Sequence, residues 1–426
     1  MADPAQLSLT EAAAAVRSGR LRAGEPSGAC RRRIETLDGA LAAWAAVNDG
    51  QAPTRGDGPL AGVPVGIKDV IDAAGLPTRA GSTLHEAFPT EDAPAVAWLR
   101  RAGATILGKT VCTEFATNDP APTRNPWDAA RTPGGSSSGS AAAVAACMCH
   151  ATLDTQTAGD ILRPAAYNGV VGFKPGLGRI SREGTVGVAW SIDTLGVQAR
   201  QVGDVTALYE VLCKEDEGTG RPVEPDHPPV IGVVRDPLLQ HCDAETDAEL
   251  RRVTAHFTRA GAVLREARPP VSLEVAVAAH RIVTFAECAS LHDELYRRAA
   301  ADLGPKFRTL LELGLVTPAA SYLRAQRVRG RLRTGLEAML REVQILLLPV
   351  VPTAAPRDRD TTGDPAFQIP WTFAGLPALA LPTGLGTGGM PLAVQLVGPR
   401  QGERDLLGAA RWCEAVLGAD LRPPLD

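Results

Sequence analysis

The chain has 426 residues, of which 45% are hydrophobic and 22% charged, and this ordinary globular usage excludes a disordered or fibrous class. The net charge of −4 gives no basic face, so we expect no nucleic-acid partner. No uncharged apolar run reaches the 18 or so residues of a membrane-spanning helix, and the first residues lack the pattern of a secretory signal. We therefore expect a cytoplasmic protein without membrane contact.

Metal and disulfide chemistry has little support in the sequence. The eight cysteines are scattered, and only Cys147 and Cys149 lie close together, without metal ligands nearby. The seven histidines are dispersed and show no zinc-enzyme spacing. We expect reduced thiols, no metal and no cofactor.

The first part of the chain changes from helical to mixed patterning. Ser8 is a candidate helix cap, and a polar link covers residues 50–59. The expected elements are helices at 11–17, 29–37 and 93–102, and strands at 63–71 and 104–108. The alternation of strand and helix predicts a covered sheet of the α/β class.

The rest of the chain continues this pattern around a helix-rich middle. The expected elements are a small-residue helix within 136–149, strands at 170–173, 186–198, 343–351 and 392–397, and a final helix at 403–416. A polar, insertion-like stretch covers 214–229. We expect one domain over 1–426, made of N-terminal helices (1–58), a core (59–200), a helix-rich variable region (201–340) and C-terminal strands with a helix (341–426).

Three segments carry chemistry. Lys68 stands in an apolar strand, where a lysine is costly unless it is paired or functional, so an ion pair with Asp69 or Asp72 competes with a catalytic role. The Gly/Ser loop at 134–140 lacks the Gly-Lys-Ser/Thr ending of a P-loop, so it indicates nucleotide binding only weakly. The turn at 156–159 offers small side chains and successive backbone N–H groups, as an oxyanion hole does.

Together these segments resemble the amidase signature family over nearly the whole chain. The matching blocks are residues 59–69, 75–82, 104–110, 113–116, 125–127, 133–140, 169–175, 178–184, 192–196, 374–379 and 391–398. The resemblance implies an α/β amidase-signature fold with a large twisted mixed β-sheet covered by helices on both faces. Its active site would lie where the strand of Lys68 meets the two loops.

The resemblance also implies catalytic roles, with one departure from the family pattern. Lys68 matches the base lysine, and Ser136 matches the serine that relays a proton. The place of the nucleophilic serine holds Asp160. The oxyanion loop would be Gln156, Thr157, Ala158 and Gly159.

Two further residues are candidates for substrate binding. Arg163 would bind a substrate carboxylate or brace the loop beside it. Ser137 would contact the substrate or make hydrogen bonds within its own loop.

Asp160 changes the requirements of the site. A carboxylate about 4 Å from Lys68 would attract it by roughly 4 kcal/mol at an effective dielectric near 20. That attraction would raise the pKa of Lys68 and keep it an ammonium ion, which cannot act as the base. Ordinary amidase turnover through an acyl-serine is therefore expected to fail.

Three interpretations of Asp160 remain open. The protein has lost hydrolysis and serves as a subunit that binds a ligand or a partner, or Asp160 works as a general base or nucleophile in altered chemistry. In the third, the substitution belongs to this sample of an ordinary serine amidase.

We expect the protein to act on a small amide, carbamoyl or acyl compound, by hydrolysis or acyl transfer, without a cofactor. The alternative is a catalytically silent homologue. The resemblance implies that the chain forms a homodimer or pairs with a small helical subunit.

Overall fold

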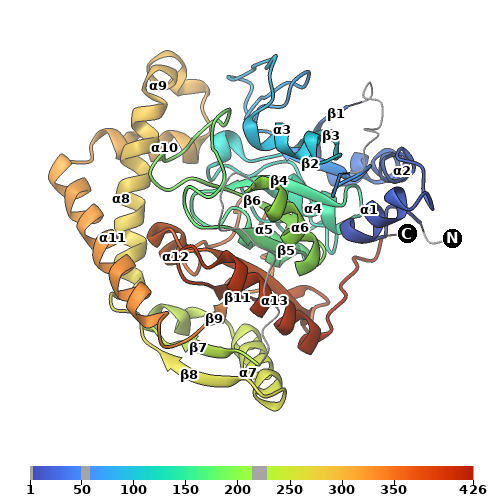
Figure 1. Ribbon diagram of the computed structural model, residues 1–426. Helices are drawn as coiled ribbons and strands as arrows, with labels where there is room; N and C mark the ends of the chain where they lie inside the picture. Colours follow the sequence, from blue (N-terminus) through green and yellow to red (C-terminus); the bar gives the residue numbers. More distant parts are fainter. Residues whose placement is uncertain (1–2, 49–57, 214–227, 426) are drawn as a thin grey trace.

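The computed structural model describes residues 3–48, 58–213 and 228–425, and one mixed sheet runs through this part of the chain (Figure 1). The sheet has eleven strands in the order β1-β3-β2-β4-β6-β5-β10-β11-β9-β7-β8. The strands are β1 (Trp44–Val47), β2 (Pro64–Lys68), β3 (Thr105–Thr110), β4 (Ala151–Gln156), β5 (Val171–Lys174), β6 (Thr194–Ala199), β7 (Val230–Val234), β8 (Val263–Ala267), β9 (Ile345–Pro349), β10 (Ala378–Leu385) and β11 (Pro391–Val397). The predicted α/β class is confirmed.

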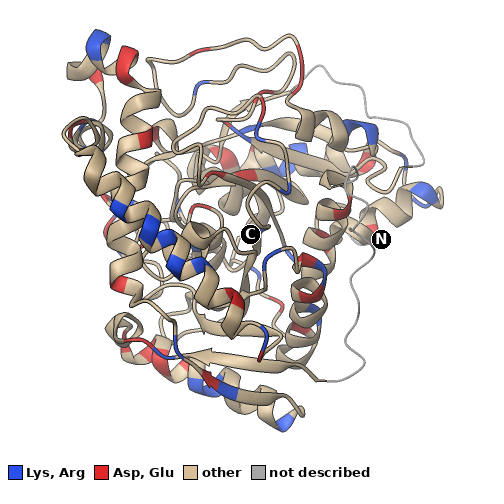
Figure 2. Ribbon diagram, turned by 60° about the vertical axis from the view of Figure 1, so that its left-hand side comes forward, with Lys and Arg blue, Asp and Glu red and all other residues tan. Residues whose placement is uncertain are grey.

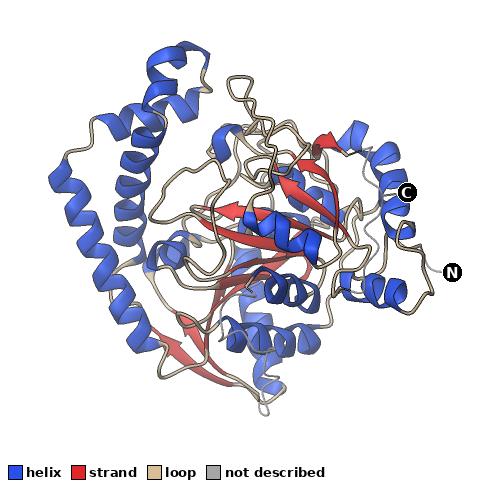
Figure 3. Ribbon diagram, turned by 45° about the horizontal axis from the view of Figure 1, so that its top comes forward, coloured by secondary structure: helices blue, strands red, loops and turns tan. Residues whose placement is uncertain are grey.

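Helices surround this sheet, and the longest of them form a layer at its outer side (Figures 1 and 3). The α-helices are α1 (Leu9–Arg17), α2 (Glu25–Leu41), α3 (Pro94–Arg101), α4 (Ser138–Ala145), α5 (Leu162–Asn168), α6 (Val202–Leu212), α7 (Ala244–Arg259), α8 (Leu273–Leu291), α9 (Asp293–Ala299), α10 (Pro305–Leu315), α11 (Ala319–Met339), α12 (Ile369–Ala374) and α13 (Glu403–Leu417). Short 3₁₀ turns are η1 (Glu114–Ala116), η2 (Pro237–His241) and η3 (Ala300–Asp302).

Both faces of the sheet are buried, as alternate residues of its strands show. In β9, Ile345 and Leu347 pack into a core with residues of α3, α6, α7 and α13. Leu346 and Leu348 of the same strand pack into a second core, with α2, α4, α5, α8, α11 and α12. Since successive side chains of a strand point to opposite faces, helices cover the sheet on both sides, as predicted.

The sheet brings two chemistry-bearing segments to one edge. β2 lies between β3 and β4 and is parallel to both, with Ile67 opposite Leu153 of β4. Carboxyl ends of parallel strands meet at the same edge. Lys68, the last residue of β2, therefore lies beside the turn that follows β4.

Most predicted elements are confirmed, but the strand expected at 186–198 is wrong in its first half. Only β6 forms there, because the side chain of Asp193 accepts hydrogen bonds from the backbone N–H groups of Val188 and Ala189. These bonds hold the segment before β6 as a loop instead of a strand.

The helix-rich middle region also contains two strands that the sequence did not reveal. β7 is a short apolar run, and β8 is an edge strand whose exposed charged residues hide its periodicity. All four regions expected from the sequence contribute strands to the sheet, although their grouping into one domain stays a prediction. The polar segments expected at 50–59 and 214–229 lie mostly outside the described residues.

The arginine-rich stretch of the sequence lies on α11, where basic residues recur along the helix (Figure 2). Within the described residues, we find no helix that combines the length and apolarity needed to cross a bilayer. The expected cytoplasmic location stays a prediction.

Candidate active site

Lys68 is fully buried at the end of β2 and makes three short polar contacts. Its Nζ lies 2.7 Å from Ser136 Oγ, 2.9 Å from Thr155 Oγ1 and 3.2 Å from the Thr155 carbonyl oxygen. Burial lowers the pKa of Lys68, and the negative charge of Asp160 opposes this only in part. The lysine is therefore easier to deprotonate than an exposed one.

The competing structural role, an ion pair with Asp69, belongs to another lysine. Lys109 of β3 places its Nζ 3.2 Å from Asp69 Oδ1, and both side chains are buried. Lys68 forms no ion pair with Asp69 or Asp72, all three being among the described residues. Lys68 is thus held by hydroxyl and carbonyl oxygens alone.

Ser136 lies in the Gly/Ser loop that leads into α4. The Gly135–Ser136 peptide bond is cis. Gly134 has a φ of 81°, and a Cβ on it would lie 2.9 Å from the Pro164 Cα, so the tight packing of this loop on α5 requires glycine. The loop therefore places the Ser136 hydroxyl directly against Lys68.

Asp160 follows β4 and points its carboxylate back into its own turn. Oδ2 accepts hydrogen bonds from the backbone N–H groups of Thr157 (2.9 Å) and Ala158 (2.8 Å), and Oδ1 accepts from Ser136 N–H at 3.3 Å. The residue is only 6% exposed. Burial alone would raise the pKa of Asp160, but Lys68, Arg163 and these N–H groups together hold it below its usual value. Asp160 is therefore a carboxylate.

Two expectations about the Lys68–Asp160 pair are wrong. Both residues are described, yet they form no direct ion pair; Ser136 lies between them, with its hydroxyl on Lys68 and its N–H on Asp160. The pKa of Lys68 is lowered rather than raised, because burial outweighs the attraction of Asp160. The turn draws the carboxylate toward its N–H groups and away from the lysine.

Residues distant in sequence brace the turn at 157–160. Gln156 Oε1 accepts from the N–H groups of Ile161 (2.9 Å) and Leu162 (3.1 Å), while its Nε2 donates to Thr372 Oγ1 at 2.9 Å. Thr372 Oγ1 lies 2.9 Å from the Ala158 carbonyl oxygen, to which it donates. These contacts fix the direction of the backbone N–H groups.

Asp193 supports the same turn from the loop before β6. Its Oδ1 accepts from Thr157 Oγ1 at 2.6 Å. Burial raises the pKa of Asp193 to about 6. Neither Asp193 nor Thr372 was a candidate from sequence, and both supporting contacts cross more than 35 positions of the chain.

The two candidate substrate-binding residues lie close to the site but are turned into the protein. Arg163 is buried and donates through Nη2 to the Gly135 carbonyl oxygen (2.7 Å) and to Thr362 Oγ1 (3.1 Å). Ser137 is also buried, and its N–H donates to the Asp160 carbonyl oxygen at 3.2 Å. Arg163 thus braces the loop, and contacts of either residue with a substrate stay predictions.

A cavity of about 380 Å³ opens beside the turn. Thr155, Thr157 and Asp193 form its inner wall, and Arg182, Trp190 and Leu291 are among the residues that surround it. This volume suits a small molecule. Among the described residues, no three His, Cys, Asp or Glu side chains gather as metal ligands would.

The geometry joins a buried lysine, a serine and a turn of convergent N–H groups, and comparison with known proteins places it. A family model described as Amidase matches residues 33–407. The chain belongs to the amidase family. One amidase-family relative, the A subunit of glutamyl-tRNA(Gln) amidotransferase from Anaeromyxobacter sp. (strain K), is 36% identical over 98% of each protein.

Solved structures show the same amidase fold. Native peptide amidase from Stenotrophomonas maltophilia has a TM-score of 0.85 and 29% identity, over 99% of each chain. A chain of an inhibitor-bound vestigial complex, related to the origins of an s-triazine catabolic enzyme, has a TM-score of 0.88 and 29% identity, over 98% of this chain and 100% of its own. Amidase-family enzymes act on amide C–N bonds, so the expectation of an enzyme is confirmed at family level.

Proposed function

We propose that this protein binds a small amide, carbamoyl or acyl compound beside Lys68, Ser136 and Asp160 and acts on its C–N or acyl bond. The reaction would be a hydrolysis or an acyl transfer. The 2.7 Å contact between Lys68 Nζ and Ser136 Oγ, next to a turn of convergent backbone N–H groups, carries this proposal. The cavity of about 380 Å³ at the same turn provides room for the substrate.

Lys68 and Ser136 would act as a proton relay. In a neutral lysine, the two N–H bonds suffice for the two oxygens of Thr155, and the lone pair is left to accept the Ser136 O–H. The lowered pKa of Lys68 favours this neutral form. Ser136 Oγ can then take a proton from the reacting group.

Asp160 alters the next step, because it has no hydroxyl from which an alkoxide can form. No acyl-serine is made at this position, so ordinary serine-amidase turnover is impaired. The carboxylate would instead act on a water molecule as general base, or attack the carbonyl carbon to give an acyl-carboxylate that water then cleaves. Its lowered pKa makes it weak in both roles, so we expect slow turnover.

A second candidate function is a catalytically silent amidase homologue that holds a ligand or a partner. The contacts of Asp160 Oδ2 favour it, because the N–H groups of Thr157 and Ala158 are already occupied by this carboxylate. In a working amidase, such donors stabilise the oxyanion of the substrate, and losing one costs roughly 10²–10³ in turnover.

We also propose that the chain works in an assembly, either with a second copy of itself or with a small helical protein. One relative is part of an amidotransferase with named subunits, and one structural neighbour belongs to a protein complex. These two relatives support an assembly without identifying the partner of this chain.

Ammonia release from a panel of small amides tests the proposed function. Native protein should release ammonia slowly, and Asp160→Ala and Asp160→Asn should each lose at least about 100-fold, because the general base or nucleophile is gone. Equal rates for all three proteins would exclude chemistry at the carboxylate and leave the silent homologue. Mass spectrometry of the peptide carrying Asp160, after turnover in labelled water, separates the two chemical roles, since only a carboxylate nucleophile takes up the label.

A further inference from the structure

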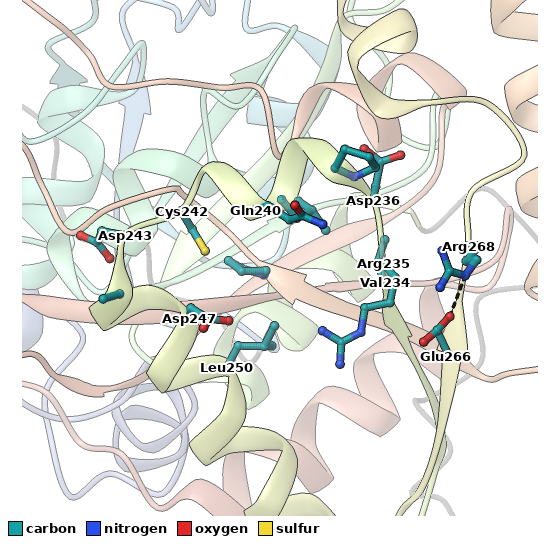
Figure 4. Close-up of a pocket in the computed structure, with 14 residues that line it drawn as sticks. Val234, Arg235, Asp236, Gln240, Cys242, Asp243, Asp247, Leu250, Glu266 and Arg268 are labelled. Atoms are coloured by element: carbon teal, nitrogen blue, oxygen red, sulfur yellow. Dashed lines mark hydrogen bonds and ion pairs between the residues drawn. The ribbon is translucent and has the colours of Figure 1, made fainter.

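The largest cavity bounded by described residues lies near the opposite end of the sheet from Lys68, and no part of the amide-binding site lines it (Figure 4). Its volume is about 610 Å³, within the range of small-molecule sites. β7, β8, β9 and α7 provide its walls, together with the turn that contains Pro237.

The topology around this cavity is that of a ligand crevice in an open α/β sheet. β7 is parallel to β8 on one side and to β9 on the other. The chain passes from β7 through α7 to β8, and returns much later to place β9 on the far side of β7. Strand order thus reverses at β7, and ligands bind outside the carboxyl ends of strands at such points.

Most charged groups of this crevice already have partners. Asp236 accepts from the N–H groups of Leu238 (2.9 Å) and Leu273 (3.2 Å). The pair of Glu266 and Arg268 closes the β8 side at 2.6 Å. These groups shape the wall but leave little charge free for a ligand.

Arg235, directly after β7, is different. Within the described chain its guanidinium makes no hydrogen bond or ion pair, and only its backbone N–H is used, toward Ala267. Figure 4 shows its side chain reaching across the cavity toward Asp247 and Leu250 of α7. Asp247 binds Arg251, one helical turn further along α7, on its other side.

We propose that this crevice binds a small zwitterion of the amino-acid class. The guanidinium of Arg235 binds the carboxylate, for which its planar pair of N–H donors is suited. Asp247 faces the ammonium group from the opposite wall. An apolar side chain of the ligand packs on Leu239, Leu250 and Pro349, which line the same cavity.

The charge balance of the lining selects this class over simpler ions. The cavity has two arginines, Arg235 and Arg268, against four carboxylates, Asp236, Asp243, Asp247 and Glu266. A plain anion would be repelled by this excess of carboxylates, and a plain cation would leave Arg235 unused. A zwitterion satisfies both sides at once.

Calorimetric titration of the full chain with three matched compounds tests this proposal. L-leucine carries both charges, 3-methylbutylamine lacks the carboxylate, and 4-methylpentanoate lacks the ammonium group. We expect L-leucine to bind at least tenfold more tightly than either analogue. Arg235→Ala should weaken L-leucine binding at least tenfold, whereas Arg268→Ala, which removes an already paired arginine, should weaken it less than threefold.

The thermal unfolding midpoint of each variant distinguishes lost binding from lost folding. An unchanged midpoint for Arg235→Ala together with lost binding supports the site. The proposal is overturned if L-leucine does not bind at millimolar concentration, if the three compounds bind alike, or if L-leucine binds Arg235→Ala as it binds the native protein. Lys68→Met should leave L-leucine binding unchanged, which separates this site from the amide site.

Discussion

The carboxylate of Asp160 accepts the backbone N–H of Ala158, two residues earlier in the chain, at 2.8 Å. The same oxygen accepts from Thr157, so one carboxylate oxygen holds two successive donors of the turn. A serine hydroxyl at this position would be too short and too weakly charged to occupy both donors in this way. The residue at position 160 therefore decides whether the turn binds a ligand or its own side chain.

Two buried lysines at neighbouring strands should respond differently to the same substitution. Lys109→Met leaves the buried Asp69 carboxylate without its cation, and we expect the free energy of unfolding to fall by about 3 kcal/mol or more. Lys68→Met removes contacts to neutral oxygens only, so its loss should be nearer 1 kcal/mol. Urea unfolding of both variants measures this, and equal losses would contradict the different roles of the two lysines.

Gln156 should be essential for the stability of the oxyanion turn. Gln156→Leu leaves the buried N–H groups of Ile161 and Leu162 without an acceptor, and each unsatisfied group costs about 1–3 kcal/mol. Gln156→Glu keeps the acceptor and should be the less destabilised variant. Thermal unfolding of the two variants is the measurement, and a Leu variant as stable as the native protein would show that these bonds do not brace the turn.

Gly159 should not tolerate even a methyl group. A Cβ at this position would lie 2.2 Å from Oε1 of Gln368, whose side chain is fully buried and donates to the Val350 carbonyl oxygen. We expect Gly159→Ala to destabilise the protein by about 1–3 kcal/mol. Gly203→Ala is the matched control, because nothing lies within 4 Å of its added Cβ, and it should be neutral or slightly stabilising. Similar unfolding midpoints for the two variants would contradict the packing argument.

Asp193 should make stability depend on pH in a defined window. Its pKa is raised to about 6 in the folded protein, so between about pH 4 and 6 the folded state binds more protons than the unfolded state. The free energy of unfolding therefore falls as pH rises through this window. Relative to Asp193→Asn, the native protein should lose roughly 3 kcal/mol between pH 4 and 7. Guanidinium unfolding at several pH values measures the difference, and a flat or rising difference would show that Asp193 ionises normally.

The candidate site was predictable where its chemistry is local in sequence. Lys68 stands out as a lysine in an apolar strand, and the loops of Ser136 and Asp160 carry their own composition signals. Sheet pairing then brings them together, as parallel β2 and β4 require.

Contacts that depend on the direction of backbone N–H groups were not predictable. Sequence placed the Asp160 carboxylate opposite Lys68, whereas the turn orients it toward Thr157 and Ala158. The support from Asp193 and Thr372 also depends on tertiary packing, for which the sequence has no local signal. β8 escaped prediction for a similar reason, since an exposed edge strand lacks the buried alternation that identifies a strand.

Ammonia release by Asp160→Ser is the most direct test of the claim that the Asp160 carboxylate blocks the oxyanion turn. Because Lys68 and Ser136 are already in contact, we expect this variant to hydrolyse at least one small amide about 10³-fold faster than the native protein, with an acyl adduct on the peptide that contains position 160. A folded Asp160→Ser variant as inactive as Asp160→Ala, with an unchanged unfolding midpoint, would contradict the claim.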